Sequence, residues 1–297
     1  MNILITGSSG FVGSHLFSFL NSKGHLVVGH TRNSNTRKLG TIICNFLEST
    51  PAVHELKNFD AVIHLVGKVH DVEGVGLESE YETLNHSSVI AFAKNCSEAK
   101  VKKFIFFSTI KTLDINIKRN DNLEGIYSIT KKKAEDSLLN FSKDTDMEIN
   151  IIRPSLIYGQ GVKGNLRTLI RLIKLGLCPP FPETNNRKYL IHIRDLSEIV
   201  ESVLGSSLDT KDIITATEIK PYSTRRVLQD LRQALGKGYT TATFPYGLIR
   251  FLMHAPLGIG FKLRKLFGDD QYEISNRGFK PRTKLTLKNI FDDNRNT

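Results

Sequence analysis

The amino-acid sequence predicts an α/β protein with a doubly wound parallel sheet and a smaller C-terminal lobe. Short apolar runs alternate with amphipathic stretches over the first half of the chain, which is typical of parallel strands joined by helices. Two runs, 61–66 and 104–107, are apolar almost throughout, as strands covered on both faces usually are. The expected strands are 2–6, 26–30, 41–44, 60–66, 103–108 and 148–153.

The start of the chain and its apolar content argue against export and against a membrane span. The first expected strand begins at Asn2, which leaves no room for a cleavable leader. The longest apolar stretch, 246–261, is interrupted by Arg250, His254 and Pro256 and is shorter than the roughly 20 residues that a span requires. We therefore expect a cytoplasmic protein.

The cysteines and histidines indicate neither disulfides nor a metal centre. Cys44, Cys96 and Cys178 are an odd number without paired spacing, as expected of reduced thiols in a cytosolic protein. No histidine pair stands at metal-ligand spacing with a carboxylate. We therefore expect no metal site.

The net charge of +11 is carried by the second half of the chain. Residues 1–150 contain 17 basic and 17 acidic side chains, whereas residues 151–297 contain 24 basic and 13 acidic ones. Three interpretations remain open: a solvated basic surface, a site for a substrate that carries a pyrophosphate, and a membrane or nucleic-acid surface.

A glycine-rich loop follows the first expected strand. Gly7, Gly10 and Gly13 open a helical pattern that continues through Leu16 and Leu20. Glycines there allow a tight turn, a close approach of backbone to a pyrophosphate and close packing of helix on strand, and the helix N-terminus supplies amide donors. The loop predicts a Rossmann-type site for a dinucleotide cofactor.

A second glycine motif, Gly-x-Gly-x-x-Gly at 159–164, lies between a later strand and helix. The first loop is better placed for the cofactor because it follows the opening strand of the alternating section. The second loop can hold an anion by the same physics.

The domain boundary is expected where the alternation of strands and helices loosens, beyond residue 154. We expect a dinucleotide-binding domain over 1–160 that also receives parts of 188–216. The remaining residues, 161–297, are expected to form mainly a substrate-binding lobe.

The end of the second strand indicates which dinucleotide is bound. An Asp or Glu there would bind the ribose hydroxyls of NAD and repel a ribose phosphate. The chain has Thr31 and then Arg32 at this place, so that a 2′-phosphate would be attracted. We expect NADP or NAD, with NADP favoured.

Tyr127 and Lys131 are a candidate catalytic pair. Their spacing of four residues places both side chains on one face of a predicted helix. An ammonium beside a phenol, together with the charge of a bound nicotinamide, lowers the phenol pKa and makes it a usable acid or base. The pair follows a strand that ends in Phe107, Ser108 and Thr109, so Thr109 would bring a hydroxyl to the same crevice.

With these motifs in place, the chain resembles the extended short-chain dehydrogenase/reductases, the NAD-dependent epimerase/dehydratase family. Further landmarks are 60–67, Asn85, Arg153-Pro154, Tyr158-Gly159 and 192–196. The segments 108–111 and 161–165 are similar to a bacterial UDP-glucose 4-epimerase-like subgroup, which includes 4-keto reductases of surface-polysaccharide synthesis.

The resemblance implies roles for the site residues. Tyr127 would exchange the proton at oxygen 4 of a nucleotide-linked sugar, Thr109 would hydrogen-bond that oxygen, and Lys131 would hold the nicotinamide ribose. Asn85 would support the site and its proton path, or would serve as a backbone tie. The expected cofactor contacts are Gly7, Ser9, Gly10, Phe11, Val12, Gly13, Thr31, Arg32, Asn45, Leu65, Val66, Gly67, Asn85, Tyr127, Lys131 and Pro154. The expected substrate contacts are Lys68, Thr109, Lys111, Tyr127, Asn165, Arg187 and Lys188.

Three reactions share this set of residues: 4,6-dehydration, 4-epimerisation and 4-keto reduction. Dehydratases of the family place an acidic pair after the catalytic threonine, where this chain has Ile110 and Lys111. Epimerases of the family keep NAD bound, whereas net reductases exchange their cofactor and often use NADPH. Thr31 and Arg32, with no carboxylate beside them, favour NADPH and therefore reduction. We therefore expect reduction of a UDP-4-keto-6-deoxy-hexose or hexosamine for O-antigen or another surface polysaccharide, with a UDP-sugar 4-epimerase that keeps NAD bound as the alternative.

Two other hypotheses stay open. A catalytically silent relative would bind a dinucleotide or RNA, but such proteins commonly lose the tyrosine or the lysine, so we expect no nucleic-acid partner. The apolar and basic stretch 248–266 allows a peripheral membrane contact, against the simpler interpretation of a helical part of the substrate lobe. The sequence does not fix the oligomeric state, and a homodimer is one alternative.

Overall fold

A computed structural model gives the structure of the chain. It describes residues 1–32, 41–69, 78–113, 123–178, 180–205, 213–239, 266–270 and 286–291, together with 243, 245, 247, 250, 251, 254 and 272.

Seven strands form one sheet in the order β3-β2-β1-β4-β5-β6-β9. The strands are β1 (Asn2–Thr6), β2 (Leu26–Thr31), β3 (Ile42–Ile43), β4 (Ala61–His64), β5 (Lys103–Phe107), β6 (Glu148–Pro154) and β9 (Ile213–Ala216). All six neighbouring pairs are parallel. The chain winds outward in both directions from β1 and β4, so the predicted doubly wound sheet is confirmed. The sequence did not predict β9.

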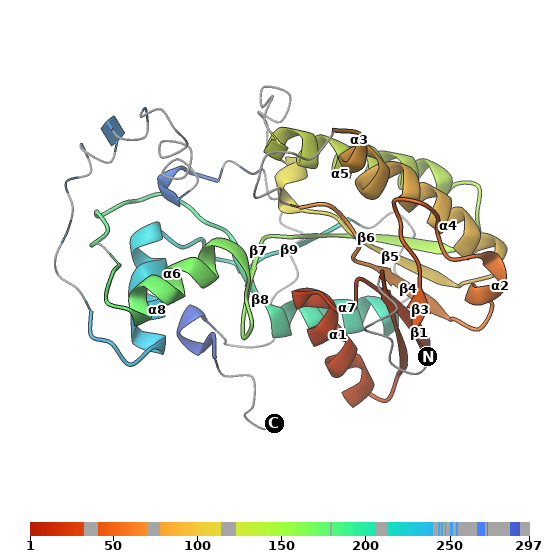
Figure 1. Cartoon of the computed structure of the whole chain (residues 1–297), viewed down its shortest axis with the longest axis horizontal. Coiled ribbons are helices and arrows are strands. Elements are labelled where there is room, and N and C mark those ends of the chain that lie inside the picture. Colours follow the sequence, from red (N-terminus) through yellow and green to blue (C-terminus); the bar gives the residue numbers. More distant parts are fainter. Residues whose placement is uncertain are drawn as a thin grey trace. The chain divides into compact units, whose positions relative to one another are not determined.

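Helices cover both faces of this sheet, which explains why its strands are apolar on both sides. Figure 1 shows α4 (Ser88–Glu98) and α5 (Leu123–Phe141) on one face, and α1 (Phe11–Ser22) and α7 (Ile193–Gly205) on the other. One hydrophobic cluster joins alternate residues of the central strands to the first of these helix pairs. It includes Leu4, Val62, Phe104, Ile149, Phe92, Ala134 and Leu138.

Short helical segments complete the first part of the chain. They are α2 (Val53–Leu56), α3 (Glu78–Glu82), a π-helical turn at Thr83–Ser87 and a 3-10 turn at Ile110–Leu113. The π-helical turn joins α3 to α4 and carries Asn85, and the 3-10 turn follows β5 and carries Lys111.

The chain divides into two compact units. The first contains Met1–Pro154 and Leu196–Ala216, and the second contains Ser155–Asp195 and Thr217–Gln271. The second unit has two short parallel strands, β7 (Leu156–Tyr158) and β8 (Leu190–His192), with the helices α6 (Gly164–Lys174) and α8 (Thr224–Ala234) and a 3-10 turn at Leu287–Asn289. The assignment of cofactor and substrate binding to these parts of the chain stays a prediction.

None of the helices that the structure describes is long and apolar enough to cross a membrane. The stretch 248–266, for which the sequence allows a contact with lipid, lies largely outside the described residues.

Candidate active site

The turn after β5 carries Thr109. Its carbonyl oxygen accepts hydrogen bonds from the backbone N–H of Thr112 at 3.2 Å and from the Thr112 hydroxyl at 2.9 Å. Its hydroxyl accepts a hydrogen bond from the backbone N–H of Lys111 at 3.3 Å. The turn therefore holds the Thr109 hydroxyl at the carboxyl end of a central strand, where ligands of such sheets bind.

Tyr127 and Lys131 lie one turn apart on α5, and both are buried. The side chains of Tyr127 and Thr109 are hydrogen-bonded to each other. The structure thus brings the predicted hydroxyl, phenol and ammonium together from two elements.

The Lys131 ammonium is held by the end of β5. Its Nζ donates a hydrogen bond to the carbonyl oxygen of Phe107 at 2.9 Å and lies 4.5 Å from the centroid of the Phe106 ring. A Cβ atom on Gly67 would lie 3.1 Å from Nζ, so glycine leaves room for the ammonium. Burial lowers the pKa of Lys131 to about 7, and the charge of Glu135 opposes that shift.

Burial sets the protonation state of Tyr127 in the chain alone. It raises the pKa of Tyr127 to about 12, although the hydrogen bond with Thr109 acts in the opposite direction. The phenol is therefore protonated at neutral pH. The lowering expected from the sequence depends on Lys131 together with the nicotinamide charge, so it stays a prediction for the enzyme with bound cofactor.

A buried ion pair that the sequence analysis missed lies beside these residues. Glu135 has no exposed surface, and Arg153 donates to it from Nε at 2.8 Å and from Nη2 at 2.6 Å. The hydroxyls of Ser108 and Thr112 also donate to Glu135. Its position four residues after Lys131 was a usable signal, since it places Glu135 on the same side of α5.

The first glycine loop has the geometry of a dinucleotide site. Gly7 has a φ of +69°, which favours glycine. A Cβ atom on Gly13 would lie 2.3 Å from the carbonyl oxygen of Gly7, so only glycine allows helix and loop to approach this closely. The N-cap residue of α1 is Gly10, so no side chain caps the first amides of the helix. The first turn also has no acidic residue. The amides of Phe11 and Val12 are therefore suited to an anion such as a pyrophosphate.

His30, which the sequence analysis did not assign, ties this loop to the neighbouring strand. The backbone N–H of Gly7 donates to Nδ1 of His30 at 3.5 Å, and Nε2 lies 2.8 Å from the carbonyl oxygen of Cys44. Burial lowers the pKa of His30, which keeps one ring nitrogen as an acceptor.

The loop after β4 is fixed from two sides. The backbone N–H of Leu65 donates to the hydroxyl of Thr6 at 3.1 Å. Oδ1 of Asn85 accepts from the backbone N–H of Lys68 at 2.9 Å, and Nδ2 of Asn85 donates to the Lys68 carbonyl at 3.0 Å. Asn85 therefore acts as a backbone tie, one of its two expected roles. The ammonium of Lys68 forms an ion pair with Glu80.

Three predicted cofactor contacts, Thr31, Arg32 and Asn45, lie at or just after the ends of β2 and β3. Thr31 is the buried last residue of β2, and Arg32 follows it on the surface. Asn45 lies two residues after β3, and its carbonyl and side chain hold the turn that follows. No described carboxylate follows β2 directly, as the sequence indicated. Pro154 is the buried last residue of β6.

Three predicted substrate residues belong to the second unit. Asn165 is exposed in the first turn of α6, and Arg187 is exposed before β8. Lys188 forms an ion pair with Asp270 at 2.9 Å. Asp270 also accepts a hydrogen bond from the backbone N–H of Tyr189 at 3.2 Å, so a phosphate at Lys188 would compete with an existing partner.

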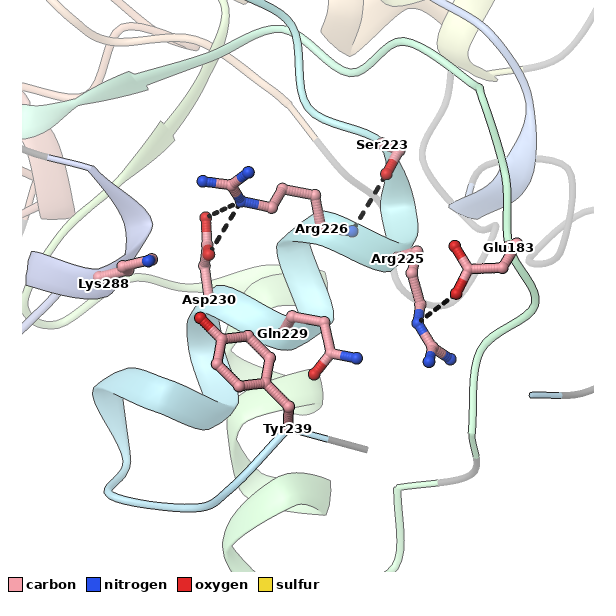
Figure 2. Close-up of a pocket in the computed structure, with 8 residues that line it drawn as sticks. All are labelled: Glu183, Ser223, Arg225, Arg226, Gln229, Asp230, Tyr239 and Lys288. Carbon is pink, nitrogen blue, oxygen red and sulfur yellow. Dashed lines mark hydrogen bonds and ion pairs between the residues drawn. The ribbon is translucent and has the colours of Figure 1, made fainter. Parts of the chain in front are cut away.

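The second unit also has a pocket of about 380 Å³ along α8, shown in Figure 2. Two of its cations are paired: Arg225 with Glu183 at 3.2 Å, and Arg226 with Asp230 at 2.8 Å. None of the predicted site residues lines this pocket.

Together, Thr109, Tyr127 and Lys131 can donate a proton to an oxygen and hold a charge nearby. The loops that follow β1 and β4 suit a nicotinamide dinucleotide. Glycine lets the backbone come close to a bound pyrophosphate, and no side chain caps the first amides of α1.

Comparisons with known proteins agree with this geometry. Residues 3–214 match the model of the NAD dependent epimerase/dehydratase family. A UDP-glucose 4-epimerase of Vibrio cholerae is 30% identical over 80% of this chain and 76% of its own length. An N-acetyl-alpha-D-glucosaminyl-diphospho-ditrans,octacis-undecaprenol 4-epimerase of Escherichia coli O157:H7 is 22% identical over 83% of this chain and 76% of its own length.

The fold agrees as well. The crystal structure of the UDP-glucuronic acid 4-epimerase from Bacillus cereus in complex with UDP-glucuronic acid and NAD has a TM-score of 0.69 and 19% identity, and the match covers 98% of this chain and 97% of that one. The family match and the relative from Vibrio cholerae confirm the resemblance predicted from the sequence, and with it the prediction of an enzyme that uses a nicotinamide dinucleotide. The chain belongs to the NAD-dependent epimerase/dehydratase family.

Proposed function

We propose that this enzyme transfers a hydride at carbon 4 of a UDP-linked sugar, with Thr109, Tyr127 and Lys131 as its catalytic residues. The observation that carries the proposal is the placement of a hydroxyl, a phenol and an ammonium at the carboxyl end of β5, within one unit with the glycine loop. The nicotinamide supplies the hydride chemistry when it is bound.

Each side chain has a separate task in this proposal. Tyr127 gives the proton to oxygen 4 of the sugar or takes it, and Thr109 holds that oxygen. Lys131 in its protonated form places a positive charge near the developing alkoxide, and it holds the nicotinamide ribose. The cofactor contacts are those expected from the sequence, from Gly7 to Pro154.

Of the two reactions open to this site, we favour net reduction of a UDP-4-keto-6-deoxy sugar. A phenol with a pKa of about 12 rests in its protonated form, and a ketone that accepts hydride needs a proton donor. Thr31 and Arg32 would accept NADPH, the exchangeable cofactor of a reductase. Ile110 and Lys111 offer no acid for dehydration.

A UDP-sugar 4-epimerase is the second candidate. The observation that favours it is the 30% identity to the UDP-glucose 4-epimerase of Vibrio cholerae. The relative from Escherichia coli, whose name describes a lipid-linked sugar, supports a place in surface-polysaccharide synthesis for either reaction.

The cofactor distinguishes the two candidates. Denatured, freshly purified protein should release no stoichiometric NAD, and the native protein should oxidise NADPH with a UDP-4-keto-6-deoxy sugar. Release of one NAD per chain together with conversion of UDP-glucose into UDP-galactose would identify an epimerase.

A substitution tests the basis for NADP. Thr31→Asp should shift the preference from NADPH to NADH by about tenfold or more, because the new carboxylate repels the 2′-phosphate and binds the ribose hydroxyls. Dissociation constants of both cofactors measure the shift, and Thr31→Ser is the matched control. An unchanged ratio would refute the argument from Arg32.

A further inference from the structure

The ion pair of Glu135 and Arg153 connects three elements around the catalytic residues. Glu135 comes from α5, Arg153 from the end of β6, and Ser108 and Thr112 from the turn after β5. The carboxylate has no exposed surface, and four donors converge on it. A buried carboxylate with this many partners is costly to disturb, because each donor would lose its acceptor.

The first consequence concerns Thr109. Ser108 precedes it and Thr112 lies three residues after it, and the hydroxyls of both donate to Oε1 of Glu135. The single hydrogen of the Thr112 hydroxyl is shared between Oε1 of Glu135 at 3.2 Å and the carbonyl oxygen of Thr109 at 2.9 Å. Glu135 therefore holds the turn by hydrogen bonds on both sides of Thr109.

The second consequence concerns Lys131. Glu135 lies one helical turn after Lys131 on α5, and it is the negative charge that opposes the loss of the ammonium proton caused by burial. The other titratable groups near Lys131 and its partner phenol are His64 on β4, Tyr81 on α3 and Tyr127 itself. Burial holds His64 and Tyr127 in their neutral forms, so neither carries a charge at neutral pH.

We propose that Glu135 is a positioning residue for two catalytic groups, holding the turn that carries Thr109 and keeping a negative charge one helical turn from the Lys131 ammonium. Arg153 is its counter-ion and limits how strongly that charge acts on Lys131. The proposal rests on the proposed function for its consequences in turnover, but its electrostatic part concerns Lys131 alone.

The test follows the titration of Lys131 by NMR of protein labelled with [ε-13C]lysine, in which Lys131→Met identifies the resonance. In Glu135→Gln the midpoint should fall by about 1 pH unit or more, because an opposite charge has been removed. Asp136→Asn is the matched control: it removes an acid at the next position of α5, whose partner is the more exposed Lys132. That variant should leave the midpoint where it is.

An unchanged midpoint in folded Glu135→Gln would overturn the electrostatic part. If Glu135→Gln does not fold, Arg153→Gln takes its place. Removal of the counter-ion should raise the midpoint of Lys131, and an unchanged value would again overturn the proposal. A merely structural ion pair would alter the melting temperature in these variants without moving the midpoint.

Measurements of turnover test the second part of the proposal, the positioning of Thr109. Ser108→Ala removes one donor and no charge, so kcat should fall about tenfold with NADPH and a UDP-4-keto-6-deoxy sugar, or with UDP-glucose, while KM and the Lys131 midpoint stay unchanged. Normal kcat in Ser108→Ala would overturn the positioning of Thr109. Wild-type protein that converts neither substrate would contradict the proposed function, whereas the NMR titration would still decide the role of Glu135.

Discussion

Two buried tyrosines, one in each unit, have opposite electrostatic surroundings. Tyr127 lies one helical turn from the ammonium of Lys131 and is hydrogen-bonded to the hydroxyl of Thr109. Tyr158, at the end of β7, donates its hydroxyl hydrogen to Oε1 of Glu218 at 2.6 Å, and Tyr222 donates to Oε2 of the same carboxylate at 2.7 Å. Burial raises the pKa of both Tyr127 and Tyr158.

The difference lies in what each phenol can do with its proton. Next to a carboxylate, the loss of a proton from Tyr158 would place two negative charges together, so Glu218 raises the pKa of Tyr158 further. The partner of Tyr127 is a neutral hydroxyl, and a cation lies nearby. A buried tyrosine is therefore a candidate acid only where its neighbours tolerate the phenolate, and the sequence motif around Tyr158 marks a structural residue.

Removal of each phenolic oxygen should separate the two tyrosines most clearly. Tyr127→Phe should reduce turnover by about 10²–10⁴-fold, the usual contribution of a general acid, while NADPH binding measured by calorimetry is retained. Tyr158→Phe is the matched control and should keep turnover within a few-fold. Near-normal activity of Tyr127→Phe would contradict the proposed acid.

Tyr158→Phe should instead reduce stability. It leaves Oε1 of the half-buried Glu218 without its phenol donor, which costs about 1–3 kcal/mol. Urea unfolding followed by circular dichroism measures this loss. A free energy of unfolding equal to that of the wild type would show that water replaces the phenol at no cost.

The two sites should also respond to pH in opposite directions. Burial lowers the pKa of Lys131 from 10.5 to about 7, so between these values the unfolded chain holds more protons and the free energy of unfolding rises with pH. Burial raises the pKa of Glu218 above 4.5. The folded protein therefore holds more protons above pH 4.5, and the contribution of Glu218 to stability falls as pH rises through its folded pKa.

Each slope is at most about 1.4 kcal/mol per pH unit for one proton. Unfolding by urea at several pH values should show that Lys131→Met loses the rise above pH 7 and that Glu218→Gln loses the fall above pH 4.5. Slopes that survive these substitutions would assign them to other groups.

Tyr222→Phe should have the smallest effect. Tyr222 is 9% exposed whereas Tyr158 has no exposed surface, so water can approach the carboxylate oxygen more easily after this substitution. We expect a loss of about 1 kcal/mol, smaller than that of Tyr158→Phe. A larger loss than for Tyr158→Phe would reverse the order of the two donors.

Much of the fold and part of the site followed from the sequence, because both depend on local patterns. Apolar runs with helical stretches between them gave the first six strands of the sheet, although β3 and β4 are shorter than expected. The glycine spacing located the loop that starts at Gly7, and the four-residue spacing placed Tyr127 and Lys131 on one face of α5. β9 was missed because 213–216 pairs with β6 only after the chain has passed through the second unit.

What the tertiary structure alone decided is how charges are shared among residues distant in sequence. The sequence places Lys131 one helical turn from Tyr127, but only the folded chain fixes its ammonium on the carbonyl oxygen of Phe107. The partnership of Glu135 with Ser108 and Arg153 likewise exists only where α5, β5 and β6 meet. Spacing determines which side chains share a face, whereas burial and the field at a titratable group depend on every element packed around it.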